Sequence, residues 1–211
     1  MITMDIITPT PRKPGRPLSF DRQAALQQAM LTFWQHGYET TSINDLTAAM
    51  GVTAPSIYTA FGDKKRLFLE AMHLYAGSPD DLQNSLDQAA TARDAASAML
   101  MSAARTFTGE TTPRGCLLAS ATASGSNASA DVQTAVANVR RDIIARLKAR
   151  IDRDIAAEDL PDTASAPTLA AMVVAVIQGM SVLARDGMDR ESLLMMTSCA
   201  LEGWPGSRIK G

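Results

Sequence analysis

The chain has 211 residues, of which 46% are hydrophobic and 20% charged, and its formal net charge is −2. This composition is typical of a globular protein and excludes a collagen-like or fully disordered chain. The two cysteines, Cys116 and Cys199, lie far apart, and only two histidines are present, which excludes a disulfide framework and zinc-ligand spacing. Alanine and methionine are abundant and aromatic residues are few, which predicts an all-α fold.

The N-terminal stretch MITMDIITPTPRKPGRP lacks the positive segment and long apolar core of a secretory signal. The longest apolar run, Leu169–Ile177, is too short to cross a bilayer. We therefore expect a cytoplasmic protein with no membrane partner. Residues 1–18 are proline-rich and lack helical periodicity, so they are predicted to form a mobile basic arm. An ordinary disordered tail is the alternative for this segment.

Residues 19–76 are predicted to form three short helices followed by a linking helix. The first begins near residues 19–21 and ends at Gly37, with apolar residues recurring at helical spacing along one face. The second lies in the segment TSINDLTAAMG. It begins with a capping box formed by Ser42 and Asp45, and it ends after about two turns at Gly51.

The third helix begins at Thr53, carries Pro55 in its first turn, and ends at Gly62. A linking helix is expected over residues 63–76. Two short helices joined by a glycine-centred turn form the helix-turn-helix arrangement. In that arrangement the front of the second helix enters the major groove of DNA while the first crosses the backbone.

The residues at the front of the third helix suit contact with base edges. Thr53 and Ser56 offer hydroxyls, whereas Ala54 and Pro55 offer apolar contact with a thymine methyl. Tyr58 lies one turn further on and can reach a phosphate. The short side chains in the segment TAPS allow the helix to approach the groove closely.

Most lysines and arginines of the first 66 residues fall in two clusters, Arg12–Arg16 and Lys64–Arg66. Lys64 and Lys65 begin the linking helix, where free N–H groups and the helix dipole favour an anion. Such small clusters indicate a local contact with a polyanion. Spacing alone leaves a second interpretation open, a three-helix domain that only packs on the rest of the chain.

Residues 12–76 closely resemble the N-terminal domain of the TetR family of transcriptional repressors. The resemblance rests on the GRP arm, the segment FWQHGY, the segment TSINDL, the turn after AAMG, the segment SIYTAF and the lysine that follows. It implies a homodimer that grips a pseudo-palindromic double-stranded DNA operator, with one recognition helix in each major groove.

The resemblance also implies which residues contact DNA. Ala54 departs from the family pattern because that position is often long and polar, and Asn44 stands where some members place a base-reading arginine. For Thr41 and Ser42, helix capping without DNA contact is the alternative. The residues expected to contact DNA are Lys13, Arg16, Thr41, Ser42, Asn44, Thr53, Ala54, Pro55, Ser56, Tyr58 and Lys64.

Residues 77–211 are expected to form a larger helical domain for ligand sensing and dimerisation. The pattern predicts helices near residues 80–90, 92–108, 115–122, 130–157, 164–186 and 189–203. The helix from about Pro167 is apolar on every side through Ile177, and the last helix is more apolar than one internal face needs. We therefore predict that helices near 167–186 and 189–203 form a two-fold dimer interface; a monomer with a large core is the alternative.

The resemblance implies a small-molecule effector whose binding weakens operator affinity. The pocket is expected among flexible apolar residues of the second domain, although ordinary core packing is an alternative for each. Cys116 has two interpretations, a redox or electrophile sensor or an inert packed thiol. No ligand spacing supports a metal, and no cofactor is expected. The predicted pocket residues are Met99, Phe107, Cys116, Leu117, Met172, Val176 and Met180.

The sequence therefore predicts a ligand-responsive transcriptional regulator, most simply a repressor. An enzyme or binding protein acting in the C-terminal half is one alternative, but the chain offers no convergent His, Asp and Ser set and no phosphate-binding glycine loop. An adaptor that has lost DNA binding is the other alternative. The intact arm, cap, turn and lysine argue against it.

Overall fold

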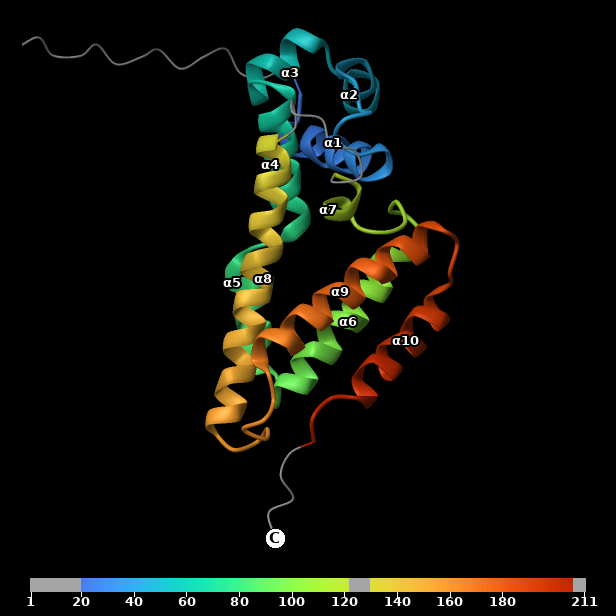
Figure 1. The fold of residues 1–211 in the computed structure, drawn as a ribbon. Helices are drawn as coiled ribbons and strands as arrows, with labels where there is room; N and C mark the ends of the chain where they lie inside the picture. The colour runs from blue at the N-terminus through green and yellow to red at the C-terminus, as the bar shows by residue number, and fades with distance from the viewer. Residues whose placement is uncertain (1–19, 122–129, 207–211) are drawn as a thin grey trace, which may run out of the picture.

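The computed structural model describes residues 20–121 and 130–206, and all regular structure within these ranges is helical (Figure 1). The helix positions predicted for the second domain are confirmed to within a few residues. The helices are α1 (Arg22–His36), α2 (Ile43–Met50), α3 (Ala54–Phe61), α4 (Lys64–Ala76), α5 (Pro79–Gln88), α6 (Ala92–Phe107), α7 (Leu117–Ser120), α8 (Ala130–Ala156), α9 (Ala166–Arg185) and α10 (Arg190–Glu202).

Helices α1 to α3 form a small N-terminal unit that packs around an aromatic core. Phe33 of α1 is fully buried and meets Phe68 of α4 edge-on, with ring centroids 5.2 Å apart. Tyr38 packs against both rings. Such tilted and edge-on aromatic pairs stabilise a core beyond the area that they bury. This aromatic core therefore joins α1 to α4.

Arg22 fastens the start of α1 to the neighbouring helices. Its guanidinium lies over the Phe61 ring, 4.4 Å from the centroid, and pairs with Glu70 of α4 at 2.7 Å. It also donates hydrogen bonds to the carbonyl oxygen of Ala60. One side chain thus connects α1, the end of α3 and α4.

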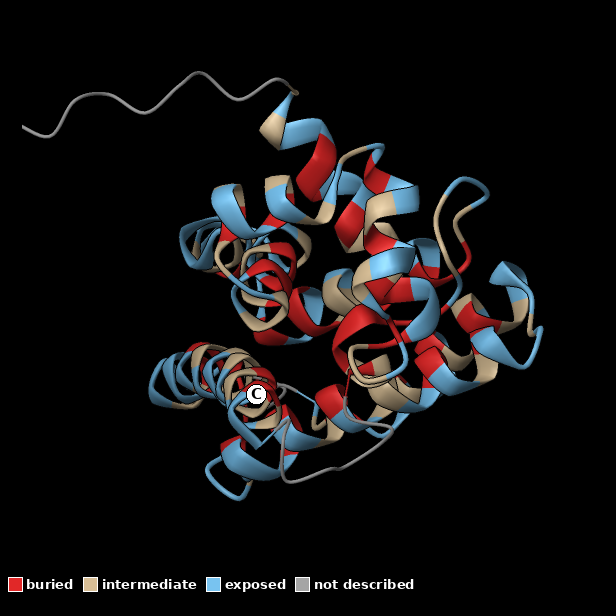
Figure 2. Cartoon of the chain, turned by 90° about the horizontal axis from the view of Figure 1, so that it is seen from above, coloured by how far each residue is buried: buried red, intermediate tan, exposed pale blue. Residues whose placement is uncertain are grey.

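The rest of the chain forms a helical body in which α8, α9, α6 and α10 pack on one another (Figure 1). By length and composition alone, α9 is apolar enough to cross a membrane. In this fold one side of α9 packs against α8, α6 and α10, and its outer side is exposed. Buried residues gather where the helices face each other and exposed residues line the outside (Figure 2).

A buried ion pair ties α8 to the turn between α5 and α6. Arg150 pairs with Asp154 one helical turn later, and both side chains are nearly inaccessible to solvent. Arg150 also donates to the carbonyl oxygens of Leu86, Ala89 and Ala90, while Asp154 accepts a hydrogen bond from the Ala92 backbone N–H. The charges are buried only because each is fully hydrogen-bonded.

Candidate nucleic-acid interface and ligand cavity

The turn between α2 and α3 depends on Gly51. Its φ of 66° lies in the left-handed region that favours glycine, and its N–H bonds to the carbonyl oxygen of Thr47. The chain then re-enters helix at Thr53, with Pro55 in the first turn of α3. Two helices of eight residues each are thereby joined by a short glycine-centred turn, as in a helix-turn-helix.

The two faces of α3 have different roles. Ile57 and Phe61 are buried and hold the helix on the core. Tyr58 is 50% exposed although its ring is large and apolar. The hydroxyls of Thr53 and Ser56 lie 2.9 Å apart and hydrogen-bond each other at the front of the helix. The outer face of α3 therefore presents paired hydroxyls at its front and a tyrosine further along the helix.

Lys64 is held in a fixed position at the start of α4. Its ammonium lies 4.6 Å from the centroid of the Tyr38 ring and donates a hydrogen bond to the carbonyl oxygen of Glu39 over 3.3 Å. Partial burial lowers the pKa of Lys64, and the charge of Glu39 opposes that change. The following residue, Lys65, pairs instead with Asp131 of α8 at 2.8 Å. Lys64 thus contacts residues of the N-terminal unit, whereas Lys65 contacts α8.

The start of α2 separates capping residues from exposed ones. The Ser42 hydroxyl accepts a hydrogen bond from the Asp45 N–H, and the Ser42 backbone N–H donates to the Asp45 carboxylate, which completes the predicted capping box. Asn44 is exposed. Thr41 is fully buried and its hydroxyl donates to the carbonyl oxygen of Gly37 over 2.6 Å. The Thr41 hydroxyl therefore lies below the surface in this structure, and a phosphate contact by Thr41 stays a prediction.

Two of the predicted DNA contacts, Lys13 and Arg16, lie outside the described residues, as does the predicted mobile arm of residues 1–18. Ala54 is half-buried at the front of α3 and adds no polar group there.

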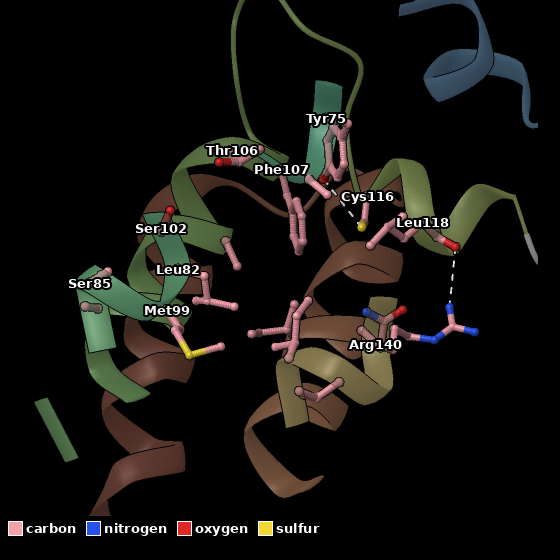
Figure 3. A pocket seen from close by; sticks show the side chains of 17 residues that line it. Tyr75, Leu82, Ser85, Met99, Ser102, Thr106, Phe107, Cys116, Leu118 and Arg140 are labelled. Atoms are coloured by element: carbon pink, nitrogen blue, oxygen red, sulfur yellow. Dashed lines mark hydrogen bonds between the residues drawn. The ribbon is translucent and has the colours of Figure 1, made fainter. Parts of the chain in front are cut away.

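A cavity of about 330 Å³ lies in the body, beside the end of α4 (Figure 3). Three residues predicted for the pocket, Met99, Phe107 and Cys116, line it. Most of the wall is apolar. Polar atoms come from a few side chains, which include Gln178 and Arg140. A largely apolar wall with few polar groups is typical of small-molecule sites.

The other four predicted pocket residues do not line the cavity. On α9 the lining positions are Val174, Ile177 and Gln178. Met172, Val176 and Met180 project from other faces of the helix, because each residue turns the helix by about 100°. Leu117 is fully buried among the side chains beneath α7. The sequence placed these residues on apolar helices correctly, but apolarity alone does not tell a cavity wall from the core.

Cys116 and Tyr75 meet at one end of this cavity. The Tyr75 hydroxyl donates a hydrogen bond to the Cys116 sulfur over 3.4 Å (Figure 3). The Cys116 N–H donates to the Ser181 hydroxyl over 2.8 Å. Burial, followed by the neighbouring Cys116, raises the pKa of Tyr75, so the phenol stays protonated and acts as a donor. Tyr75 is not among the predicted cavity residues, although the linking helix that carries it was predicted.

The outer faces of α9 and α10 carry apolar and small residues without cover from the same chain. Val182 is 56% exposed and Met195 is 58% exposed. Ala171, Ala175 and Gly179 are also exposed, and they continue the row that ends at Val182 along α9. A contiguous exposed apolar strip of this kind is typical of a protein interface.

Among the residues that the structure describes, no group of three His, Cys, Asp or Glu side chains is placed to hold a metal ion.

Comparison with known proteins agrees with this geometry. Residues 25–71 match the family model of bacterial regulatory proteins of the tetR family, and residues 92–193 match the tetracyclin repressor-like C-terminal domain. The HTH-type transcriptional repressor ComR of Escherichia coli (strain K12) is 32% identical over 194 residues, which are 90% of this chain and 92% of ComR.

Solved structures give the same result. A cysteine mutant of the TetR family regulator CifR, complexed with 26 bp double-strand operator DNA, is 39% identical with a TM-score of 0.85, over 90% of this chain and 100% of that chain. The reduced form of E. coli NemR shares the fold at 20% identity and a TM-score of 0.76, over 89% of this chain and 98% of that chain. The chain therefore belongs to the TetR family of transcriptional regulators, which bind operator DNA as dimers and respond to small molecules, and it is not an enzyme.

Proposed function

We propose that this regulator is released from its operator when a compact, largely apolar molecule occupies the cavity beside α4. The cavity volume of about 330 Å³ is roughly twice that of an engineered cavity that holds benzene. It therefore suits a molecule of about two rings or an equivalent branched chain. Gln178 and Arg140 supply hydrogen-bond donors for one polar group on such a molecule.

One observation carries this proposal: the same helix serves the DNA side and the cavity. Lys64 begins α4 and Tyr75 lies in its last turn, where it lines the cavity. The two residues are eleven positions apart, which is about 16 Å along an α-helix. A molecule that shifts the end of α4 therefore acts directly on the helix that carries the proposed phosphate-binding lysine.

We further propose that Thr53, Pro55, Ser56 and Tyr58 contact the operator from α3, with Lys64 holding a phosphate. Ser42 and Asn44 at the start of α2 and the arm residues Lys13 and Arg16 remain proposed contacts. Residues 19–76 are proposed to act as the DNA-binding domain and residues 77–211 as the sensing and dimerisation domain. Because its partner is the operator, we propose the cytoplasm as its location.

The test has two stages. Genomic DNA fragments retained by the purified full-length protein at moderate salt are sequenced, and the recovered operator is labelled for fluorescence anisotropy. A panel of one- and two-ring alcohols, phenols, amides and carboxylic acids is then screened for release of that operator. We expect the active compounds to lose their effect when Val174 is replaced by Trp, which fills the cavity. Release that is unchanged in this variant would contradict the proposed site.

A reaction with Cys116 is the second candidate, because this thiol lines the cavity wall. A soft electrophile that enters the cavity can meet the sulfur. The variant Cys116→Ser distinguishes the two, since serine still accepts the Tyr75 hydrogen bond but does not form a stable thioether. Release retained in Cys116→Ser supports non-covalent occupancy, whereas release lost only in this variant supports covalent sensing.

A further inference from the structure

Trp34 connects the DNA-binding helices to the body through three hydrogen bonds. Its indole N–H donates to the carbonyl oxygen of Gly115 over 2.8 Å. Its own carbonyl oxygen accepts from the Arg185 guanidinium at 3.0 Å and from the Ser120 hydroxyl at 3.4 Å. Trp34 belongs to the last turn of α1, whereas its three partners lie on the body. The end of α1 is thus fixed from several sides.

Gly115, which accepts the indole hydrogen bond, lies so close to α9 that it has no room for a side chain. A Cβ at Gly115 would lie 2.8 Å from the Ser181 carbonyl oxygen and 2.6 Å from the Arg185 guanidinium, and its φ is +80°. The carbonyl that receives the indole hydrogen bond is therefore held rigidly against α9. Because the packing around Gly115 is tight, a small displacement of a neighbouring group also displaces Gly115.

Tyr75 is the side chain that lies between the cavity and Trp34. Its ring meets the Trp34 indole edge-on, with centroids 4.8 Å apart, while its hydroxyl reaches the Cys116 sulfur. The ring also lines a second hollow of about 590 Å³, bounded by Met30 and Trp34 of α1. Tyr75 is thus a partition, with the first cavity on one side and this second hollow on the other.

On the cavity side, the Tyr75 hydroxyl contacts the Cys116 sulfur and the Leu117 backbone. Thioether and thiol sulfurs are weak hydrogen-bond acceptors, and the Cys116 sulfur is the acceptor for the Tyr75 hydroxyl. Tyr75 also lies one residue before the end of α4 and two residues before Gly77, whose φ is +74°. On its other side, the second hollow provides space. The ring therefore has room to move away from an occupied cavity.

We propose that Tyr75 is the positioning residue that transmits occupancy of the cavity to the DNA-binding helices. An occupied cavity pushes the ring toward the second hollow, the edge-on contact with Trp34 is lost, and the end of α1 shifts with the helices packed on it. This inference rests on the proposed function of the cavity. It assigns to one side chain the step between effector binding and operator release.

The test replaces the unidentified effector with a built-in occupant. Val174→Phe adds a ring to the cavity wall, and its effect on operator affinity is measured with Tyr75 present and in the Tyr75→Ala background. We expect Val174→Phe to weaken operator binding by about tenfold in the first case, within the usual range of coupling between sites, and by less than about twofold in the second. Tyr75→Phe is the matched control. It keeps the ring, so the tenfold effect should persist.

The outcomes separate this inference from the proposed function. An equal loss of affinity with and without the Tyr75 ring would overturn the role of Tyr75 while leaving the cavity coupled to DNA. If Val174→Phe changes affinity in neither background, the coupling of the cavity itself is refuted, and this inference with it. Circular dichroism confirms that each variant is folded, and Ile177→Phe serves as a second occupant if Val174→Phe is not.

A second readout needs no DNA. Trp34 and Trp204 are the two tryptophans of the chain, so Trp204→Phe leaves Trp34 as the sole reporter. In that background, Val174→Phe is expected to shift the Trp34 emission maximum when Tyr75 is present and to leave it unchanged in Tyr75→Ala. An emission maximum that does not respond to the occupant with Tyr75 present would contradict the inference even if Tyr75→Ala no longer binds DNA.

Discussion

The indole N–H of Trp34 donates a hydrogen bond to the carbonyl oxygen of Gly115 over 2.8 Å, which joins residues 81 positions apart in the chain. The bond is buried and links the end of the first helix to the segment just before Cys116. Because both partners are shielded from water, loss of the donor leaves an unsatisfied carbonyl. This contact therefore stabilises the junction as well as positioning the DNA-binding helices.

Trp34→Phe is expected to lower the free energy of unfolding by about 2–4 kcal/mol, because it removes both a buried donor and part of a packed ring. Chemical denaturation measures the change. Trp204→Phe is the matched control, since the Trp204 indole nitrogen is buried but has no hydrogen-bond partner among the described residues. A loss in Trp204→Phe as large as that in Trp34→Phe would show that packing, rather than the hydrogen bond, accounts for the effect.

Tyr58→Ala is expected to weaken operator binding by about fivefold or more, since loss of a DNA contact of this kind commonly costs at least about 1 kcal/mol. The melting temperature should stay nearly unchanged because the side chain is 50% exposed and lies outside the core. Fluorescence anisotropy and thermal melting measure the two quantities on the same samples. Unaltered affinity would remove Tyr58 from the interface.

Lys64→Ala extends the same test to the phosphate contact. The loss of operator affinity should be nearly independent of operator sequence. The magnitude of the slope of log affinity against log salt concentration should decrease by about one. Lys148→Ala, which removes a lysine from α8, is the control and should leave the slope unchanged. Equal slopes for Lys64→Ala and Lys148→Ala would show that Lys64 does not neutralise a phosphate.

The sequence was sufficient to predict the N-terminal unit because its signals are local. Caps, glycine-terminated helices and the proline in the first turn of α3 each act within one helical turn, and the structure confirms the Ser42 and Asp45 capping box and the Gly51 turn. Ile57 and Phe61 lie four residues apart, which places both on the buried face of α3. Such features need no knowledge of the rest of the fold.

The cavity could be predicted only in part because it depends on contacts between distant segments. Met99, Phe107 and Cys116 were identified from apolar character, but Tyr75 was assigned only to the helix that carries it. Nothing in the local pattern shows that the end of α4 will meet the segment around Cys116. The burial of Thr41 against Gly37 likewise follows from the packed turn and not from its neighbours in sequence.

The capping box of α2 predicts a dependence of stability on pH. The backbone N–H and hydroxyl of Ser42 hold the pKa of Asp45 below its usual value of 3.8. Since the folded pKa is lower than the unfolded one, the carboxylate contributes its full stabilisation above about pH 4 and loses it as the pH falls through the folded pKa. The stability difference between the unmodified protein and Asp45→Asn should therefore be constant near neutral pH and shrink below about pH 4.

Urea unfolding over a series of pH values measures this difference. Asp81→Asn, which neutralises an exposed carboxylate in the first turn of α5, is the control. The stability difference from the unmodified protein is expected to depend on pH differently in Asp45→Asn and in Asp81→Asn. The same profile in both would indicate a general charge effect rather than the cap.

The buried pair of Arg150 and Asp154 can be compared with an exposed pair on the same helix. Asp154→Ala leaves the Arg150 charge buried without its partner, and it also removes the acceptor for the Ala92 N–H. We expect a loss of about 3–5 kcal/mol in the free energy of unfolding. Asp152→Ala breaks the exposed pair with Lys148, also four residues apart, and should cost far less. Similar losses in the two variants would contradict the structural role of the buried network.

Gly179→Leu tests the proposed dimer interface without disturbing the protomer. A Cβ added at Gly179 meets nothing within 4 Å in the chain itself, and leucine is the better helix former. A partner subunit packed closely on the exposed row of α9 would clash with the larger side chain, so the variant should sediment as a monomer. The protomer itself should stay folded. Operator affinity should fall because one subunit can occupy only one half-site. Leu74→Glu, which places a charge at an exposed apolar residue of α4, should leave the dimer intact. A dimer that persists in Gly179→Leu would move the interface away from this face of α9.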